Sequence, residues 1–551
     1  MQDIEEYLYT ERNLHTPEDR SAFLKPDFEL HTHDPFLLSD MVKTIERIKK
    51  AVDEKEVIGV YTDYDCDGIP GAVIVSDFLK ALRHTDFHVY IPDRQIDGYG
   101  LAQKGIDFLH EKGVTLIITI DLGITGHESV LYAKTLGIET IITDHHLPHA
   151  TLPDAYAIVN PKKEGDEYPF KELCGTGVVY KVICAFLEKY RAEYNVAVGF
   201  EKWLLDMVGM ATLADMVPLV GENRVFSYYG LVVLRKTKRK GLKKLFALNF
   251  MKEATLAEED ITHTIVPRIN ASSRMGSAYV AYRMLTTDDM TEAEICAKEL
   301  ESLNRKRKAH VAAITKEVHK MDESVFADSV IVVGDPKWRP GVLGLVAAKL
   351  VDEYQKPVFV WGGSDEEDVD MLKGSCRAPE GHNVVDLMTR AQDIFGHFGG
   401  HTGAGGFSID KKDIFDFKKR LLSEYDAYIR DQKKESTTPV FFEKSFPVTA
   451  VHEKLFMTIN QFAPFGLQNE KPVLKIEGVV LESWKLFGKG SEHLEMICVV
   501  NGTRIKAISF FKTEASFARE FLVGDTYTLF VYLEMSYFLR KELRLRIIEV
   551  I

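Results

Sequence analysis

The chain has 551 residues, 45% of them hydrophobic and 28% charged, a composition typical of soluble globular proteins and a length that favours about three or four domains. No apolar run reaches the roughly 18 residues that span a bilayer, and the acidic first residues lack a signal-peptide pattern, so we expect no membrane contact. The net charge of −14 excludes a generally basic surface but not a local groove for nucleic acid. Six scattered cysteines without a CxxC pair favour reduced thiols and a cytoplasmic location.

Residues 1–45 are interpreted as a helical extension, and the first pattern with chemical meaning is VIGVYTDYDCDG at 57–68. A short apolar run leads into Asp63, Asp65 and Asp67 and then into a helical pattern, which is typical of a buried parallel strand followed by a loop and a helix. Such carboxylates lie at the carboxyl end of the strand, where open α/β sheets bind ligands. Like charges this close repel unless a cation neutralises them, which favours a divalent metal. A solvated acidic turn explains the motif alone equally well.

The next segments alternate between strands and helices, which predicts a parallel sheet. Strands are expected at 87–91, 115–120 and 139–143, and helices at 105–112 and 128–136. Acidic and imidazole side chains follow the later elements: Asp121 after 115–120, Asp144, His145 and His146 after 139–143, and Asp215 after the apolar helix 203–213. Because the carboxyl ends of parallel strands meet at one edge, we expect these groups to converge there and to supply metal ligands.

The second half of the chain divides by pattern into three parts. Residues 288–322 predict one long amphipathic helix. From residue 329 a strand–helix–strand pattern precedes a glycine-rich run, HFGGHTGAGG, whose backbone N–H groups can approach phosphates closely. After a polar linker at 430–438 come short strands rich in β-branched and aromatic residues, in which Asn501-Gly502 predicts a type I′ hairpin.

Two sets of residues have competing interpretations. The basic run 235–244, RKTKRKGLKK, is interpreted as a solvated helix end in preference to a nucleic-acid patch. Basic and aromatic residues of the β-rich end are candidates for holding unpaired bases, although each aromatic taken singly is more simply a core residue. These candidates are Trp484, Arg504, Lys506, Phe510, Phe511 and Tyr537.

Four motifs in this order, DYDCDG, IDLG, TDHH and TLADMVPLVGENR, resemble those of the DHH phosphoesterase superfamily. Further on, PRINASSRMG, WRPGVLGLVAAKL, GSCRAPEGHNVVDL and HFGGHTGAGGFSI resemble its RecJ branch, the single-strand-specific exonucleases. The resemblance implies an α/β fold: a parallel-sheet DHH domain joined by a long helix to a smaller α/β DHHA1 domain, plus a C-terminal all-β OB-fold. The implied units are an N-terminal extension (1–45), the DHH catalytic domain (46–287), the connector helix (288–322), the DHHA1 substrate-binding domain (323–428) and the OB-fold nucleic-acid-binding domain (439–551).

The resemblance also implies two divalent metal ions, Mn²⁺ or Mg²⁺, as cofactors. Asp65 and Asp67 would bind separate ions, with Asp121 bridging them, and His145 and Asp215 would complete the second site. The resemblance further implies that His146 contacts the scissile phosphate and that Asp144 orients the two histidines.

One position departs from the superfamily pattern, because Tyr61 stands where many members carry a histidine ligand. The first ion would then rely on Asp63 or on water and would bind more weakly. The resemblance also implies a pocket for the 5′ end of the substrate, in which guanidinium groups hold the terminal phosphate. The implied substrate-binding residues are Arg94, Arg268, Arg274, Ser375, Arg377, Gly399, Gly400 and His401.

The function implied is that of a metal-dependent, single-stranded-DNA-specific 5′-to-3′ exonuclease that releases nucleoside 5′-monophosphates in DNA repair and recombination. Its implied partners are single-stranded DNA, a helicase and a single-stranded-DNA-binding protein. One alternative is a DHH-family phosphodiesterase for short oligonucleotides or cyclic dinucleotides, against which the C-terminal β domain argues. The other is a binding protein that keeps the fold without the chemistry, against which the intact acidic and histidine positions argue.

Overall fold

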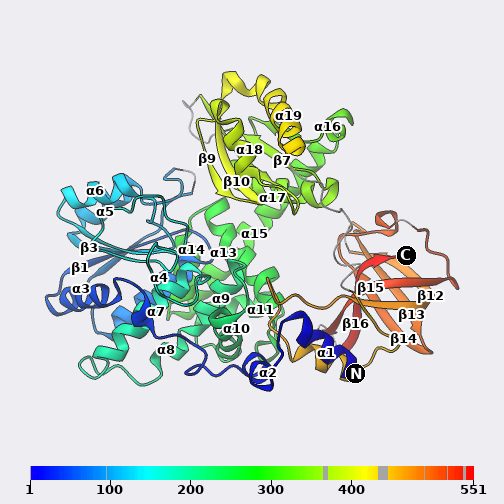
Figure 1. Cartoon of the computed structure of the whole chain (residues 1–551), viewed down its shortest axis with the longest axis horizontal. Helices are drawn as coiled ribbons and strands as arrows, with labels where there is room; N and C mark the ends of the chain where they lie inside the picture. The colour runs from blue at the N-terminus through cyan, green and yellow to red at the C-terminus, as the bar shows by residue number, and fades with distance from the viewer. Residues whose placement is uncertain are drawn as a thin grey trace.

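The computed structural model describes residues 2–94, 96–363, 370–431, 445–488, 490–517, 519–537 and 541–551. Within these ranges the strands form three separate sheets, and Figure 1 shows the three corresponding lobes, with the long helix α15 running between the first two. No helix in the described ranges is both long enough and apolar enough to cross a bilayer.

The first lobe contains a five-stranded sheet in the order β2-β1-β3-β4-β5, with every neighbouring pair parallel. The sequences VIGVYT, VTLIITI and ETIIT are rich in β-branched residues and are buried on both faces, as strands of a covered parallel sheet must be. The strands are β1 (Val57–Thr62), β2 (Phe87–Tyr90), β3 (Val114–Ile120), β4 (Glu139–Thr143) and β5 (Ala157–Val159).

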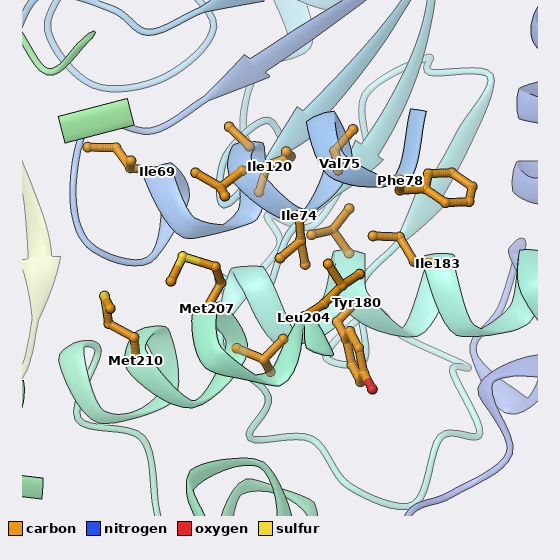
Figure 2. Packing of buried hydrophobic residues seen from close by; sticks show 14 of the residues in the cluster. Ile69, Ile74, Val75, Phe78, Ile120, Tyr180, Ile183, Leu204, Met207 and Met210 are labelled. Atoms are coloured by element: carbon orange, nitrogen blue, oxygen red, sulfur yellow. The ribbon is translucent and has the colours of Figure 1, made fainter. Parts of the chain in front are cut away.

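Helices cover both faces of this sheet and form two hydrophobic cores. On one face lie α5 (Gln103–Glu111) and α6 (His127–Thr135). On the other face lie α4 (Gly68–Ala81), α7 (Gly175–Tyr190) and α9 (Leu205–Ala214). Figure 2 shows Ile74 of α4, Ile183 of α7 and Met207 of α9 meeting in this second core. Burial of side chains of this size stabilises the fold by about 1.5–3 kcal/mol each, so α4 and α7 are held firmly against the sheet edge that carries the acidic residues.

The remaining helices of the first lobe surround this core. They are α3 (Met41–Asp53), α8 (Phe200–Trp203), α10 (Gly221–Leu234), α11 (Lys240–Leu248), α12 (Glu258–Asp260), a π-helical turn (Ile261–Ile265), α13 (Val266–Met275) and α14 (Tyr279–Thr286). Helix α2 (Pro17–Leu24) instead packs Phe23 and Leu24 against the hydrophobic cluster of the third lobe.

The connector is the single helix α15 (Met290–Val318), slightly shorter than the predicted 288–322. Asp289 caps its start by accepting hydrogen bonds from the backbone N–H groups of Thr291 and Glu292. Leu300 and Ile314 of the predicted apolar stripe are buried, in the cores of the first and second lobes respectively. The helix is therefore built into both lobes and fixes their relative position.

The second lobe has a mixed sheet in the order β6-β7-β8-β10-β9. Its strands are β6 (Ile331–Asp335), β7 (Val358–Gly362), β8 (Met371–Arg377), β9 (His397–His401) and β10 (Ala404–Asp410), of which only β6 and β7 are parallel neighbours. Its helices are α16 (Ser324–Ala327), α17 (Pro340–Tyr354), α18 (Val384–Arg390) and α19 (Ile414–Asp431). The predicted linker at 430–438 lies outside the described residues beyond Asp431.

The third lobe is a closed β-barrel, because β12 pairs with β15 as well as with β13. Its strands are β11 (Phe446–Pro447), β12 (Leu474–Phe487), β13 (His493–Val500), β14 (Thr503–Ser509), β15 (Thr526–Ser536) and β16 (Glu542–Val550), preceded by helix α21 (Glu453–Asn460). Asn501 and Gly502 have φ angles of 46° and 77°, which confirms the predicted type I′ hairpin.

The N-terminal helix α1 (Gln2–Glu11) packs on this barrel, so that the two ends of the chain lie in the same lobe (Figure 1). Ile4, Leu8 and Tyr9 of α1 are buried in the same hydrophobic cluster as barrel residues. Arg12 donates a hydrogen bond from Nε to Asn469 Oδ1 (2.6 Å). No sequence pattern had indicated this partnership between α1 and the barrel.

The interpretation of the basic run 235–244 as a solvated helix end is wrong for Arg239. Its guanidinium is nearly enclosed and forms ion pairs with Asp206 (2.7 Å) and Asp77 (2.9 Å). Arg235 donates from Nε to the carbonyl oxygen of Leu256 (2.9 Å). These two arginines therefore tie α10 and α11 to neighbouring elements of the first lobe.

A buried ion pair gives a test of this packing. Lys181 of α7 lies 2.9 Å from Glu222 of α10, and both side chains are almost fully enclosed. Lys181→Met leaves the Glu222 carboxylate buried without its counter-charge, so we expect the free energy of unfolding to fall by about 3 kcal/mol. Lys189→Met, on the same helix, breaks an exposed pair with Glu46 and should change the free energy of unfolding by less than about 1 kcal/mol. Equal shifts of the two thermal midpoints in calorimetry would contradict this.

Candidate metal centre and phosphate pocket

Three neighbouring strands of the first sheet deliver carboxylates to one edge. Asp63, Asp121 and Asp144 directly follow β1, β3 and β4. The ladder continues through them, since Asp63 N donates to Ile120 O (3.2 Å) and Asp121 N to Thr143 O (3.0 Å). Asp121 has a φ of 61°, in the left-handed region that aspartate tolerates better than most residues and that is common at functional sites. The predicted convergence of these strand ends is therefore present in the structure.

The acidic and imidazole groups form overlapping clusters whose ligand atoms lie within 4.8 Å of one another. The first cluster contains Asp63, Asp65 and Asp121, and the second contains Asp67, His145 and Asp215. Asp121 lies between them, because its Oδ1 is 3.1 Å from His145 Nε2. His145 Nε2 is also 3.7 Å from Asp215 Oδ2 and 3.8 Å from Asp67 Oδ2.

Backbone N–H groups hold the carboxylates of the first motif in place. Asp67 accepts hydrogen bonds from Gly175 N (2.6 Å) and Thr176 N (2.8 Å), which form the first turn of α7, where the helix dipole favours negative charge. Asp65 Oδ1 accepts hydrogen bonds from Asp67 N (2.8 Å) and Gly68 N (3.2 Å). Each carboxylate is thus oriented by contacts that still leave it lone pairs for a cation.

Asp144 binds the histidine pair and does not belong to either cluster. Its Oδ1 accepts hydrogen bonds from the backbone N–H groups of His145 and His146 and from the ring Nδ1 of His146 (2.8 Å). Burial raises the pKa of Asp144, but the hydrogen bond from His146 and the positive charge of that ring outweigh burial and hold this pKa below its usual range. The same bond raises the pKa of His146 against the effect of burial. Asp144 therefore fixes the orientation of His146.

The electrostatics of the clusters fit divalent cations. Burial, and then the neighbouring carboxylates, raise the pKa values of Asp63, Asp121 and Asp215 well above normal, and raise that of Asp67 to about 6. Burial, followed by the charge of His146, lowers the pKa of His145 to about 3, so its ring is neutral and available as a ligand.

Two buried oxygens give the same indication from geometry. Asp63 Oδ1 and Asp121 Oδ1 accept no hydrogen bond from any described residue. Buried carboxylate oxygens without donors are unfavourable unless a cation binds them. Carboxylates with one imidazole are ligands suited to Mn²⁺ or Mg²⁺, so the residues present fit such ions.

Tyr61 does not contribute to either cluster. Its hydroxyl accepts a hydrogen bond from Ala102 N (3.0 Å) and donates to Gly100 O (3.3 Å), and its ring packs 5.0 Å from that of Tyr90. The first cluster is therefore made of carboxylates alone, with Asp63 among them.

Several predicted substrate-binding residues meet at the start of α17 in the second lobe. Arg274 Nη1 donates to Gly341 O (2.9 Å), and Arg377 Nη1 donates to Ser375 Oγ (3.1 Å). A Cβ added to Gly344 would lie 2.9 Å from Ser375 Oγ and 3.0 Å from Arg377 Nη2, which places both side chains against the N-terminal part of the helix, one turn after its start. Guanidinium groups beside a helix N-terminus form a strongly favourable site for a phosphate.

Arg94 belongs to the same group. Its guanidinium lies over the ring of Tyr64, 5.0 Å from the centroid. Burial, and then the positive charges of Arg94 and other arginines, lower the pKa of Arg274 to about 9. The charge of Arg94 also lowers the pKa of Arg377, after the effect of burial. We call Arg94, Arg274, Ser375 and Arg377 the phosphate pocket.

The remaining predicted substrate contacts divide into two groups. His401, at the end of β9, has its ring nearly parallel to that of His146 at 6.3 Å, so this strand, which carries Gly399 and Gly400, faces the metal clusters across the gap between the lobes. Arg268 is used elsewhere: it is buried and donates to Glu301 Oε2 (2.7 Å), to Thr264 O (2.7 Å) and to Asn249. These contacts engage Arg268 with structural partners of the first lobe and the connector and do not bring it into contact with Arg274, Ser375 or Arg377.

Two residues at the site were missed by sequence reasoning. Asn270 Oδ1 accepts a hydrogen bond from Cys66 N (2.8 Å) and so supports the loop between Asp65 and Asp67. The half-exposed Tyr99 places its hydroxyl 3.2 Å from His146 Nδ1 and donates to Asp121 O (3.4 Å). One feature of the sequence indicated Tyr99, namely its position in the loop after β2. The carboxyl end of β2 lies at the sheet edge that carries the acidic residues.

Comparisons with known proteins agree with this arrangement. Three family models match the chain: the DHH family N-terminal domain at residues 57–212, the DHHA1 domain at 323–431 and the RecJ OB domain at 443–549. The single-stranded-DNA-specific exonuclease RecJ of Bacillus subtilis is 36% identical over 92% of this chain, which spans 63% of that protein's length. Its namesake from Haemophilus influenzae is 31% identical over 91% of this chain and 88% of its own length.

A solved structure shows the same fold. The crystal structure of RecJ in complex with Mn²⁺ from Thermus thermophilus superposes with a TM-score of 0.78 at 24% identity, over 99% of this chain and 75% of that one. The lobes and clusters together define a DHH-family protein with a DHHA1 domain and an OB-like barrel. Within this class, the chain belongs to the RecJ family, whose curated members are named single-stranded-DNA-specific exonucleases.

A matched pair of glycine variants tests the metal centre. A Cβ added to Gly175 would lie 2.5 Å from Asp121 Cβ and 2.6 Å from Asp121 Oδ1, whereas one added to Gly177 would meet no atom closer than 3.6 Å. We expect Gly175→Ala to displace Asp121 and to weaken Mn²⁺ binding by about 10–100-fold in calorimetric titration. Gly177→Ala, in the same turn of α7, should bind Mn²⁺ as the wild type does. Unchanged affinity in Gly175→Ala would contradict the assignment of Asp121 as a ligand.

Proposed function

We propose that this chain is a metal-dependent exonuclease that degrades single-stranded DNA from the 5′ end and releases nucleoside 5′-monophosphates, in DNA repair and recombination. One observation carries the proposal: two carboxylate-rich clusters lie in the first lobe, beside a pocket of arginines to which both lobes contribute, and the charge of Arg94 in that pocket acts on Asp63. A strand end brings two phosphates to these places, the scissile phosphodiester to the clusters and the terminal phosphate to the arginines.

The proposed cofactors are two divalent ions, Mn²⁺ or Mg²⁺, one in each cluster. Asp63 and Asp65 would hold the first, Asp67, His145 and Asp215 the second, and Asp121 both. When bound, such ions would supply a water nucleophile at neutral pH and would neutralise charge on the phosphoryl oxygens.

His146 is proposed to bind the scissile phosphate. Its Nδ1 is occupied by Asp144, which leaves Nε2 to donate to a phosphoryl oxygen. The raised pKa of His146 favours the doubly protonated ring, which donates and carries positive charge. His401 approaches from the opposite lobe and is proposed to contact the same part of the strand.

The phosphate pocket is proposed to set the polarity. A terminal phosphate offers more negative charge and more acceptor oxygens than an internal one, so the guanidiniums of Arg94, Arg274 and Arg377 would bind it preferentially. The pocket belongs to both lobes and lies at a fixed place relative to the metal clusters. Cleavage would therefore fall at a fixed distance from the terminal phosphate and release one nucleotide each time.

The barrel is proposed to hold the strand beyond the site. Phe511 is 81% exposed and offers a face for base stacking, with Tyr537 partly exposed as well. Trp484 is a weaker candidate, because its Nε1 donates to Phe521 O (3.2 Å) and its ring packs on the barrel core. Arg504 lies 2.5 Å from Glu482, and Lys506 lies 3.2 Å from Glu542, so both would have to exchange an acidic partner for a phosphate.

Partners and location follow from the same proposal. A helicase and a single-stranded-DNA-binding protein would supply the unpaired substrate. A cytoplasmic location agrees with the six cysteines, all of which are free thiols. The match to the RecJ OB domain argues against the alternative, a phosphodiesterase for short oligonucleotides or cyclic dinucleotides.

End-labelled single strands test both the reaction and its direction. In Mn²⁺ or Mg²⁺, the 5′ label should appear first as a mononucleotide, and a duplex of the same sequence should persist. Asp67→Asn and Asp121→Asn should each lower kcat by at least about 10²-fold, since each removes charge from a cluster. Asp154→Asn, which alters an exposed pair with Lys134, should leave the rate unchanged. Release of the 3′ label first would overturn the polarity, and turnover retained in both cluster variants would overturn the metal mechanism.

A further inference from the structure

The connector helix α15 has a polar patch that neither the fold nor the proposed reaction explains. Asn304 is 1% exposed, yet its Oδ1 has no hydrogen-bond partner in the described part of the chain. Arg307, one turn further on, has a buried Nε that also lacks a partner there. Buried polar atoms without partners are rare in folded proteins and indicate a missing ligand or a functional role.

The neighbours of this patch are the elements that carry the phosphate pocket. Leu303 packs against Gly276, directly after α13, and a Cβ at Gly276 would lie 3.3 Å from Leu303 Cδ2. Arg274 is in the last turn of α13, two residues before Gly276, and Arg307 is four residues after Leu303 on the same face of α15. This register puts Arg307 one helical turn from the contact with Gly276, on the connector side of the pocket. The electrostatics agree, since the positive charge of Arg307 is among the causes that lower the pKa of Arg274.

The positive charges of the arginines in and beside the phosphate pocket have no acidic partners among the residues that the structure describes. Across the described ranges, none of Arg94, Arg274, Arg307 and Arg377 lies within 4.0 Å of a carboxylate oxygen. Buried and half-buried like charges destabilise one another unless an anion binds between them. In a chain whose net charge is −14, four arginines without acidic partners indicate a site for a strongly charged anion.

We infer that Arg307 is a fourth guanidinium of the phosphate pocket and a specificity-determining residue for strands that end in a 5′-phosphate. This inference rests on the proposed function for its substrate. The four arginines come from three parts of the chain: Arg94 and Arg274 from the first lobe, Arg307 from the connector, and Arg377 from the second lobe. A terminal phosphate bound among these arginines forms charge-assisted hydrogen bonds with all three parts at once. A 5′-hydroxyl end carries no charge and cannot form such bonds with them.

Activity measurements compare Arg307→Gln with a control on the same helix. Arg305 is two residues away, and its side chain is 71% exposed, so Arg305→Gln removes the same charge outside the pocket. For the wild type and Arg305→Gln, we expect the same preference in kcat/KM for a 5′-phosphorylated over a 5′-hydroxyl oligonucleotide. Arg307→Gln should reduce this preference about tenfold through KM, as expected for loss of one charge-assisted contact. Arg307→Lys should restore part of it, since it keeps the charge.

A binding measurement without catalysis separates this inference from the proposed function. With EDTA present, a deoxynucleoside 5′-monophosphate should raise the thermal midpoint of the wild type and of Arg305→Gln, and the matching nucleoside should not. The increase should be smaller in Arg307→Gln and intermediate in Arg307→Lys. If the wild type degrades no DNA but shows this pattern, the proposed function fails and the pocket assignment stands. Equal protection of Arg307→Gln and Arg305→Gln, or an equal loss of activity on both oligonucleotides, would overturn the role of Arg307.

Discussion

Repulsion among buried carboxylates at one edge of a parallel sheet is the interaction on which the rest of this structure depends. Asp63, Asp67 and Asp121 would not remain charged side by side in this environment without compensation. The fold supplies part of that compensation through backbone donors, most clearly where the first turn of α7 binds Asp67. The fold leaves Asp63 Oδ1 and Asp121 Oδ1 without hydrogen-bond donors among the described residues. A bound cation would supply the positive charge that these two oxygens lack.

The phosphate pocket, to which both lobes contribute, gathers positive charge in the same way. Arg274 and Arg377 repel one another and Arg94, and the helix N-terminus of α17 adds further positive potential. The acidic clusters attract cations and the arginines attract anions, and the proposed substrate, a strand end accompanied by divalent ions, would satisfy both. The connector α15 is buried in the cores of both lobes, so the separation between the two kinds of charge is set by the fold.

The sequence was informative where chemistry follows directly from backbone geometry. Asp63, Asp121 and Asp144 each follow a short apolar strand, and parallel strands place their carboxyl ends together, so their convergence could be predicted. Asn270 and Tyr99 could not be found in this way, because their contacts depend on how a distant helix and a loop pack on that edge. Arg239 was misinterpreted because its basic neighbours suggest solvent, while Asp206 and Asp77, which enclose it, lie 33 and 162 residues away in the sequence. Arg268 lies in a recognisable motif, but a motif does not reveal that Glu301 binds the side chain.

The packing of α1 on the barrel has a consequence for how this protein is made. Ile4, Leu8 and Tyr9 complete a hydrophobic core whose other buried members come from residues 451–550, and Arg12 binds Asn469 across 457 positions of sequence. During translation, α1 leaves the ribosome before any strand of the barrel, so its apolar partners in that lobe are absent until residues 451–550 have followed it. The barrel must therefore be the last lobe to reach its final form, and a fragment that begins after residue 444 would expose the apolar surface that α1 covers.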